Sequence, residues 1–241
     1  MRFSAHVGLG VLSLALAGCR APQTAYQPTA SPKVAEVAAR EGLDQDLFPL
    51  TEGNEWKFTL EASRMTNGRV GRSASGIVAY RVTQVEKTPE EVRATVEISL
   101  NDLLTDRQVW LVNSKGLWQV SSGLKPNEFD PPQPIIPFPV REGAKFWWKG
   151  LAPFPNGKEG EVKLHGWILG RQEVDSAAGR YSAYAVQIDT SYDQGTDPVK
   201  TSATFWFAPG VGMVRLQERF ASKTVLALQL LKLKSRSLKH P

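Results

Sequence analysis

Three histidines and a single cysteine limit the chemistry that this 241-residue chain can perform. His6 and His240 stand near the two ends, so His165 is the one histidine well inside the sequence. This excludes a multi-histidine metal site and leaves one candidate base for a Ser-His-Asp arrangement. The sequence contains no Gly-x-Ser-x-Gly, Walker or Gly-x-Gly-x-x-Gly motif. We therefore expect His165 to be a surface residue, and the chain to be no enzyme and to use no cofactor or metal.

Three carboxylates form the remaining catalytic candidate, because Asp189, Asp193 and Asp197 recur every four residues. Hydrolysis of a glycan needs two carboxyl groups at a fixed separation, which spacing in the sequence cannot establish. The spacing also lacks the full pattern of a calcium loop. An acidic hairpin loop is the simpler interpretation. A secreted hydrolase of envelope polymers, using carboxylates near Asp189, is kept as the alternative function.

All seven tryptophans follow the first 50 residues, and most fall in runs that read as strands. Core packing is their default role. Trp147 and Trp148 are adjacent, however, and neighbours in a strand point to opposite faces. One of the two side chains must therefore point to the opposite face from the other, which favours a groove for an apolar or sugar-like ligand. The candidate ligand-binding residues are Trp147, Trp148, Trp167 and Trp206.

Alternation of apolar and polar residues dominates the chain from Phe48 onward. Its clearest example is the segment 92–100, where valine, alanine, isoleucine and leucine alternate with polar residues. This period is typical of half-buried antiparallel strands, and turn signals such as Ala178-Gly179 separate the runs. The pattern predicts an all-β fold. We expect two tandem antiparallel β-meander units, packed as a curved sheet, half-barrel or sandwich, after a signal peptide and a flexible tether.

An internal repeat supports the two units. The segment 48–56 matches 138–146 as a Phe-Pro-aliphatic-x-Glu-Gly opening, and 110–117 matches 206–213 as aromatic strand, tight turn and second strand. Both matches occur in the same order at offsets of 90 and 96 residues. Between the units, 126–139 holds six prolines and is expected to run extended as a connection rather than as a central strand.

The first 19 residues carry a different signal. Arg2 precedes an apolar run, Val7 to Leu16, that is half the length of a membrane-spanning helix. Leu16-Ala17-Gly18-Cys19 follows, and this tetrapeptide resembles the lipobox of bacterial lipoproteins. The resemblance implies cleavage before Cys19 and a membrane anchor of two or three acyl chains on that residue. The segment 206–214 also resembles a stretch of uncharacterised bacterial envelope proteins with β-rich domains, which implies a fold and no activity.

These observations divide the chain. The expected parts are a signal peptide at 1–18, the lipidated cysteine and tether at 19–47, β-units at 48–124 and 138–231, a Pro-rich connection at 125–137, and a basic tail at 232–241. Residues 20–33 are too polar to order themselves, and 34–41 has helical spacing. A single cysteine also excludes an internal disulfide.

Composition says little about partners beyond the membrane. Loss of Arg2 with the leader leaves 28 basic against 24 acidic side chains, a mild excess. We expect no nucleic-acid partner outside the cell. The expected function is a non-catalytic envelope lipoprotein that binds an apolar ligand, a glycan or an envelope protein. Arg20 is not the aspartate that favours inner-membrane retention in typical Gram-negative lipoproteins, so the resemblance implies an outer-membrane location facing the periplasm.

Lipidation of Cys19 can be checked directly. We expect mass spectrometry of protein purified from its native host to show a mature chain that begins at Cys19 with acyl groups on that residue. An unmodified thiol, or an intact leader on cytosolic protein, would contradict the anchor.

Overall fold

Twelve antiparallel strands make up the computed structural model, which describes residues 47–66, 69–153, 159–193, 199–220 and 224–234. The strands are β1 (Glu55–Thr66), β2 (Arg69–Lys87), β3 (Glu91–Leu100), β4 (Leu103–Asn113), β5 (Gly116–Ser122), β6 (Asn127–Pro137), β7 (Lys145–Pro153), β8 (Glu159–Ser176), β9 (Gly179–Tyr192), β10 (Val199–Ala208), β11 (Gly212–Phe220) and β12 (Thr224–Lys234). The leader, Cys19, the tether with its expected helix, Asp197 and His240 lie outside the described residues. The described residues include no helix that is long and apolar enough to cross a membrane.

The strands close into one barrel, each pairing with its neighbours in chain order and β1 pairing with β12. The prediction of an all-β antiparallel fold is confirmed, whereas the curved sheet, half-barrel or sandwich is replaced by a closed barrel. β1 has ten partners on β12, from Glu55 opposite Lys234 to Arg64 opposite Thr224. Three residues assigned to the basic tail, 232–234, therefore belong to β12.

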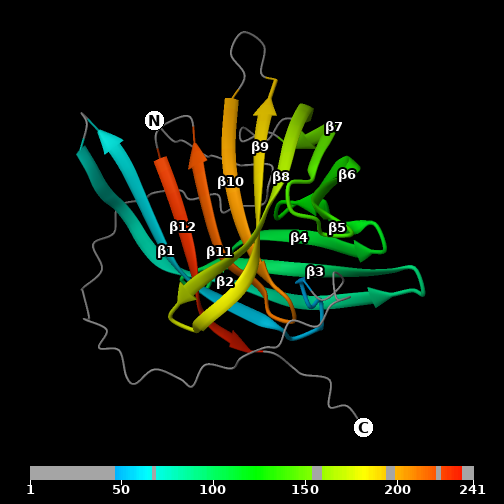
Figure 1. Ribbon diagram of the computed structural model, residues 1–241, viewed down its shortest axis with the longest axis horizontal. Helices are drawn as coiled ribbons and strands as arrows, with labels where there is room; N and C mark the ends of the chain where they lie inside the picture. The colour runs from blue at the N-terminus through cyan, green and yellow to red at the C-terminus, as the bar shows by residue number, and fades with distance from the viewer. Residues whose placement is uncertain (1–46, 67–68, 154–158, 194–198, 221–223, 235–241) are drawn as a thin grey trace.

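The barrel is far from a round cylinder. In Figure 1, β3 and β4 run across the view while β9 and β10 run along its vertical, so two walls cross at a steep angle. Side chains fill the space between these walls. The interior positions follow the period of two, as in β3, where Ala94, Val96 and Ile98 are buried between partly exposed neighbours.

The segment before β1 plugs one end of the barrel. The Phe48 ring stacks between Trp56 and Trp110, with centroids 4.8 and 4.7 Å away, and meets the Phe207 ring edge-on at 6.1 Å. The Trp56 indole Nε1 donates a 2.6 Å hydrogen bond to the carbonyl of Val211, in the β10–β11 turn. We call this end, where β1 begins, the plugged end. It joins β1, β4 and β10, which come from both halves of the sequence.

The Glu-Gly parts of the two Phe-Pro openings form the same turn. The backbone N–H of Gly53 donates to Val82 at 2.9 Å, and that of Gly143 donates to Ile168 at 2.8 Å. Both glycines have positive φ values, 83° and 77°, which a residue with a side chain rarely adopts. Six strands follow each opening. The duplication and its boundaries stay predictions, since similar turns do not by themselves establish a repeat.

The Pro-rich connection is a strand of the barrel, contrary to expectation. β6 pairs with β5 at six positions, two of which are Pro134 opposite Trp118 and Pro137 opposite Gly116. Toward β7, in contrast, it has one paired position, Asp130 opposite Leu151, while every other described pair of neighbouring strands has at least five. Proline lacks an N–H and cannot donate to a ladder. The extended backbone was predicted correctly, but its place in the sheet was not.

We call the boundary between β6 and β7 the β6–β7 seam. Side-chain contacts hold it together in place of a backbone ladder. The Trp148 indole Nε1 donates a 3.1 Å hydrogen bond to the Pro131 carbonyl, and the Phe129 ring meets Trp148 at 6.3 Å. A Cβ atom at Gly150 would lie 2.4 Å from the Trp148 ring and 2.5 Å from the Asp130 carbonyl. Only glycine permits this approach.

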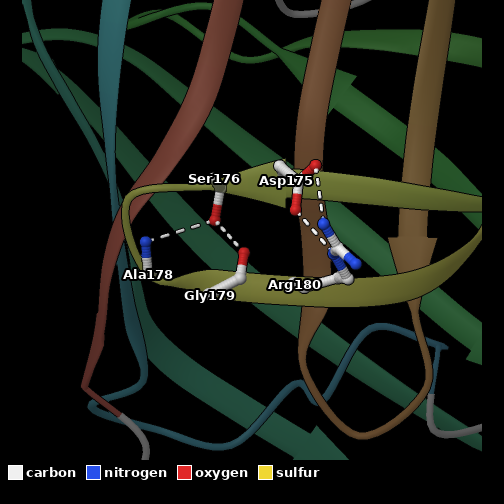
Figure 2. Close-up of polar contacts among 5 residues, drawn as sticks. All are labelled: Asp175, Ser176, Ala178, Gly179 and Arg180. Carbon is white, nitrogen blue, oxygen red and sulfur yellow. Dashed lines mark hydrogen bonds and ion pairs between the residues drawn. The ribbon is translucent and has the colours of Figure 1, made fainter. Parts of the chain in front are cut away.

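The hairpin formed by the far halves of β8 and β9 reaches across β12 (Figure 1). At its tip, the Ser176 hydroxyl donates to the Gly179 carbonyl and accepts from the Ala178 N–H, and the Arg180 guanidinium pairs with Asp175 at 2.7 Å (Figure 2). The Ala178 N–H also donates to the Leu230 carbonyl of β12 at 3.3 Å. The hairpin thus contacts the part of β12 that extends past β11.

Truncation of the plug should cost stability. We expect Phe48→Ala to lower the free energy of unfolding by about 3 to 5 kcal/mol, because it empties a site between two stacked indoles. Urea unfolding monitored by fluorescence measures the change. Phe138→Ala, at the half-buried matching position, is the control and should cost clearly less. An equal loss in both variants would show that the stacking around Phe48 has no special weight.

Candidate functional site

An aromatic patch lies on the outer face of β7, β8 and β9. It arises because alternate residues of three neighbouring strands face outward in register, so that Trp147 lies opposite His165, which lies opposite Asp189. We define the aromatic patch by these residues and the two rows that flank them: Lys145, Trp147 and Lys149 of β7, Lys163, His165 and Trp167 of β8, and Gln187 and Asp189 of β9.

The rings of the patch are held edge to face. The His165 ring lies 5.6 Å from Trp147 at 80° and 5.6 Å from Trp167 at 89°. Trp147 is 63% exposed, a high value for the largest apolar side chain. His165 is a surface residue, as predicted. Figure 1 shows β7, β8 and β9 side by side along one flank of the barrel.

Charged side chains border the rings. Glu161 bridges two lysines, with Lys149 Nζ at 2.7 Å and Lys163 Nζ at 3.1 Å. Their hydrogen bonds lower the pKa of the Glu161 carboxyl from its ordinary value. On the other side, the Gln187 amide donates to Asp189 at 3.2 Å. The patch therefore combines aromatic faces with donors and acceptors of hydrogen bonds.

The four tryptophans predicted to bind ligand are divided among three environments. Trp147 and Trp167 share the aromatic patch, while Trp148 points inward at the β6–β7 seam, so the opposite orientation of the adjacent pair is confirmed. Trp206 lies on another part of the barrel. Its indole donates to Gln172 at 2.9 Å and is covered by the Arg215 guanidinium at 5.0 Å, so it is buried and not part of the patch.

The structure describes two of the three carboxylates of the alternative hydrolase, Asp189 in β9 and Asp193 directly after it. Asp189 and Asp193 are four residues apart at the end of β9, which corresponds to about 13 Å in an extended chain. Glycosidase carboxyl pairs lie about 5 to 9.5 Å apart. This arrangement does not favour a catalytic pair.

The barrel interior contains polar side chains that sequence reasoning missed. Its buried atoms without a hydrogen-bond partner belong to Gln119, Gln133, Thr190, Thr201 and Glu218, and a further such atom, Arg215 Nε, belongs to the guanidinium that covers Trp206. Glu218 is 0% exposed and neither of its oxygens has a partner. A signal existed, since Glu218 follows Leu216 by two residues and so shares its inward face.

Asp106 is the contrasting interior acid, because its carboxylate is fully bonded. It accepts hydrogen bonds from the N–H groups of Arg107 and Gly123 and from the side chains of Gln108 and Ser122. Burial still raises the pKa of Asp106, and these hydrogen bonds oppose the rise. Asp106 therefore ties the β5–β6 turn to β4.

Comparison with known proteins yields solved structures of low similarity, among them the following three. No family model and no curated protein matches the chain. An inferred exported protein of Bacteroides fragilis with a YmcC-like fold has 16% identity and a TM-score of 0.49, over 78% of this chain and 98% of that one. An inferred lipoprotein of Parabacteroides distasonis has 15% identity and a TM-score of 0.49, over 78% of this chain and 98% of that one. The hypothetical lipoprotein YmcC of Escherichia coli has 12% identity and a TM-score of 0.37, over 80% of this chain and 90% of that one. These values are too low to support a conclusion about this chain.

Glu218 should make stability depend on pH. Burial raises its pKa well above 4.5 in the folded protein, so the folded state holds the proton more tightly than the unfolded state. The resulting stability is complete below about pH 4.5 and is lost as the pH rises toward the folded-state pKa. We expect Glu218→Gln to remove this loss, so that it exceeds the natural protein in stability near pH 7 by more than about 1 kcal/mol.

Urea unfolding at several pH values between 4 and 8 measures this difference. Glu159→Gln, at an exposed position of β8, is the control and should follow the natural protein. Parallel pH profiles for the natural protein and Glu218→Gln would refute the buried proton.

Proposed function

We propose that this chain is a lipoprotein of the bacterial cell envelope, anchored through Cys19, and that its barrel is a non-catalytic module whose aromatic patch binds an envelope glycan. The anchor rests on the lipobox-like tetrapeptide and the apolar run before it. The absence of an aspartate after Cys19 favours an outer-membrane location facing the periplasm. The single observation that carries the binding function is the 63% exposure of Trp147 beside His165 and Trp167.

Glycan is favoured over lipid by what surrounds the indoles. The row that contains Trp147 continues into His165 and Asp189, and the next row pairs Trp167 with Gln187. Indole faces can stack on the C–H faces of sugar rings, while the histidine, aspartate and glutamine groups can bond to hydroxyls. One exposed aliphatic side chain, Leu151, also faces outward on β7, but Lys149 lies between it and Trp147, so the apolar area is interrupted by charge rather than extended as on a lipid-binding surface.

A patch without catalysis is the simpler function of this geometry. His165 and Asp189 are neighbours across strands, but Ser202 lies opposite Asp189 rather than beside His165. A serine-histidine-aspartate system needs the histidine between the other two. Binding requires none of these alignments.

Substitution of the most exposed indole tests the binding function. We expect Trp147→Ala to weaken binding of an envelope glycan about 30-fold, since truncation of a central tryptophan commonly costs about 2 kcal/mol or more. Tryptophan fluorescence titration of the mature chain against a panel of soluble fragments from the host envelope measures the affinity. Leu103→Ala removes an apolar side chain of β4 that is even more exposed, at 73%, and should leave binding unchanged.

Two results would contradict the proposed function. One is a complete lack of binding to the panel by the natural protein. The other is equal weakening by Trp147→Ala and Leu103→Ala, which would indicate nonspecific adhesion to apolar surface.

A further inference from the structure

The unpartnered polar atoms inside the barrel need an explanation. Buried polar groups in native proteins almost always have a partner, and exceptions point to a bound water, ion or ligand. The structure describes seven such atoms inside this barrel, on Gln119, Gln133, Thr190, Thr201 and Glu218. All five side chains are at most 5% exposed. Water from outside therefore does not satisfy them.

These side chains lie along one band of the interior. Gln119 is opposite Gln133 on β5 and β6, and Thr190 is opposite Thr201 on β9 and β10. Glu218 lies opposite Ala203, two residues from Thr201, at a diagonal position where Cα atoms are about 7 to 8 Å apart. One end of the band is thus an acid with two hydroxyls, and the other end is a pair of amides.

The β6–β7 seam crosses the band between its two ends. Trp148 lies opposite Leu164, which lies opposite Thr190. Across the seam, Asp130 lies opposite Leu151. Because the strands are antiparallel, Gln133, three residues after Asp130, lies about level with Trp148, three residues before Leu151. Trp148 and Leu164 therefore lie between the hydroxyl end and the amide end of the band.

The chemistry of the band favours a cation that donates hydrogen bonds. Five of the seven unpartnered atoms are oxygens, and two of these belong to the Glu218 carboxyl. The buried polar and charged side chains that the structure describes include no lysine, arginine or histidine. The other ionisable groups that face the same interior include Tyr80, Asp106 and Tyr192, which follows Thr190 by two residues on β9. Burial, and then the charges of Asp106 and Glu218, raise the pKa of Tyr80, so both acids lie within electrostatic reach of Tyr80.

We propose that the barrel interior binds a small molecule with a protonated amine, the ammonium group lying at Glu218, Thr201 and Thr190. This site is separate from the aromatic patch and does not depend on it. The β6–β7 seam is the way in, because one backbone pair and the side chains around Trp148 hold it. Every other described strand boundary would need at least five backbone pairs to open.

Binding would exchange one cation for another at Glu218. The empty site holds a proton on the carboxyl, and the ammonium group replaces it, so the carboxyl ionises and one proton leaves to solvent. An amine that carries its charge throughout the range should therefore bind more tightly as the pH rises from 5 to 8. Glu218→Gln cannot undergo the exchange.

Matched pairs of probes test the site on the mature chain. Calorimetry and thermal unfolding compare putrescine with 1,4-butanediol, glucosamine with glucose, and ethanolamine with ethylene glycol. We expect at least one amine to bind and raise Tm, its hydroxyl analogue to bind at least ten-fold more weakly, and about one proton to be released in buffers of different ionisation enthalpy. Glu218→Gln should weaken that amine ten-fold or more and abolish the proton release.

Three variants locate the effect. Thr201→Val keeps the size of the side chain, removes one acceptor and should also weaken the amine. Glu159→Gln and Trp147→Ala should leave amine binding unchanged, because both lie outside the band, and Trp147→Ala separates this result from glycan binding. The proposal is overturned if no amine binds, if an analogue binds as well as its amine, if Glu218→Gln or Thr201→Val binds like the natural protein, or if a crystal soaked with amine holds only water at Glu218.

Discussion

The pairing of β1 with β12 is the constraint on which the rest of the molecule depends. It joins residues about 170 positions apart along ten paired positions and removes the two edges that a twelve-stranded meander would otherwise expose. With this ladder in place, the strands follow one another around the barrel in chain order and none has a free edge. The aromatic patch and the interior band both need that order, since each is assembled from outward or inward residues of neighbouring strands.

Closure creates a second problem, which is volume. The interior of an eight-stranded barrel can be filled by side chains, whereas a barrel of sixteen or more strands leaves a channel. A twelve-stranded barrel has an interior of intermediate width. This barrel has two walls that cross steeply, and it places Phe48 and its neighbours in the plugged end. Apolar side chains fill most of the interior. The band of polar side chains is the part of the interior that apolar side chains do not fill.

The sequence predicts local features well and distant ones poorly. Alternation identifies β3, and the adjacency of Trp147 and Trp148 places them on opposite faces, because both depend only on the period of a strand. Closure has no local signal, since β1 and β12 pair across about 170 residues of sequence. The prolines of β6 led to the wrong prediction of a connection outside the sheet. Their missing N–H groups are tolerated in the barrel because β7, the next strand, forms almost no ladder with β6. Glu218 was overlooked because an acid is not expected at an inward position.

The prolines of β6 have a consequence for colloidal behaviour. A loosened seam would expose two strands, and exposed strands invite addition of another chain and aggregation. Four prolines, Pro131, Pro132, Pro134 and Pro137, deprive β6 of donors, and β7 carries lysines at 145 and 149. Proline and lysine are residues with which natural sheets block such contacts. The barrel can therefore loosen at one boundary while remaining a poor template for other copies of itself.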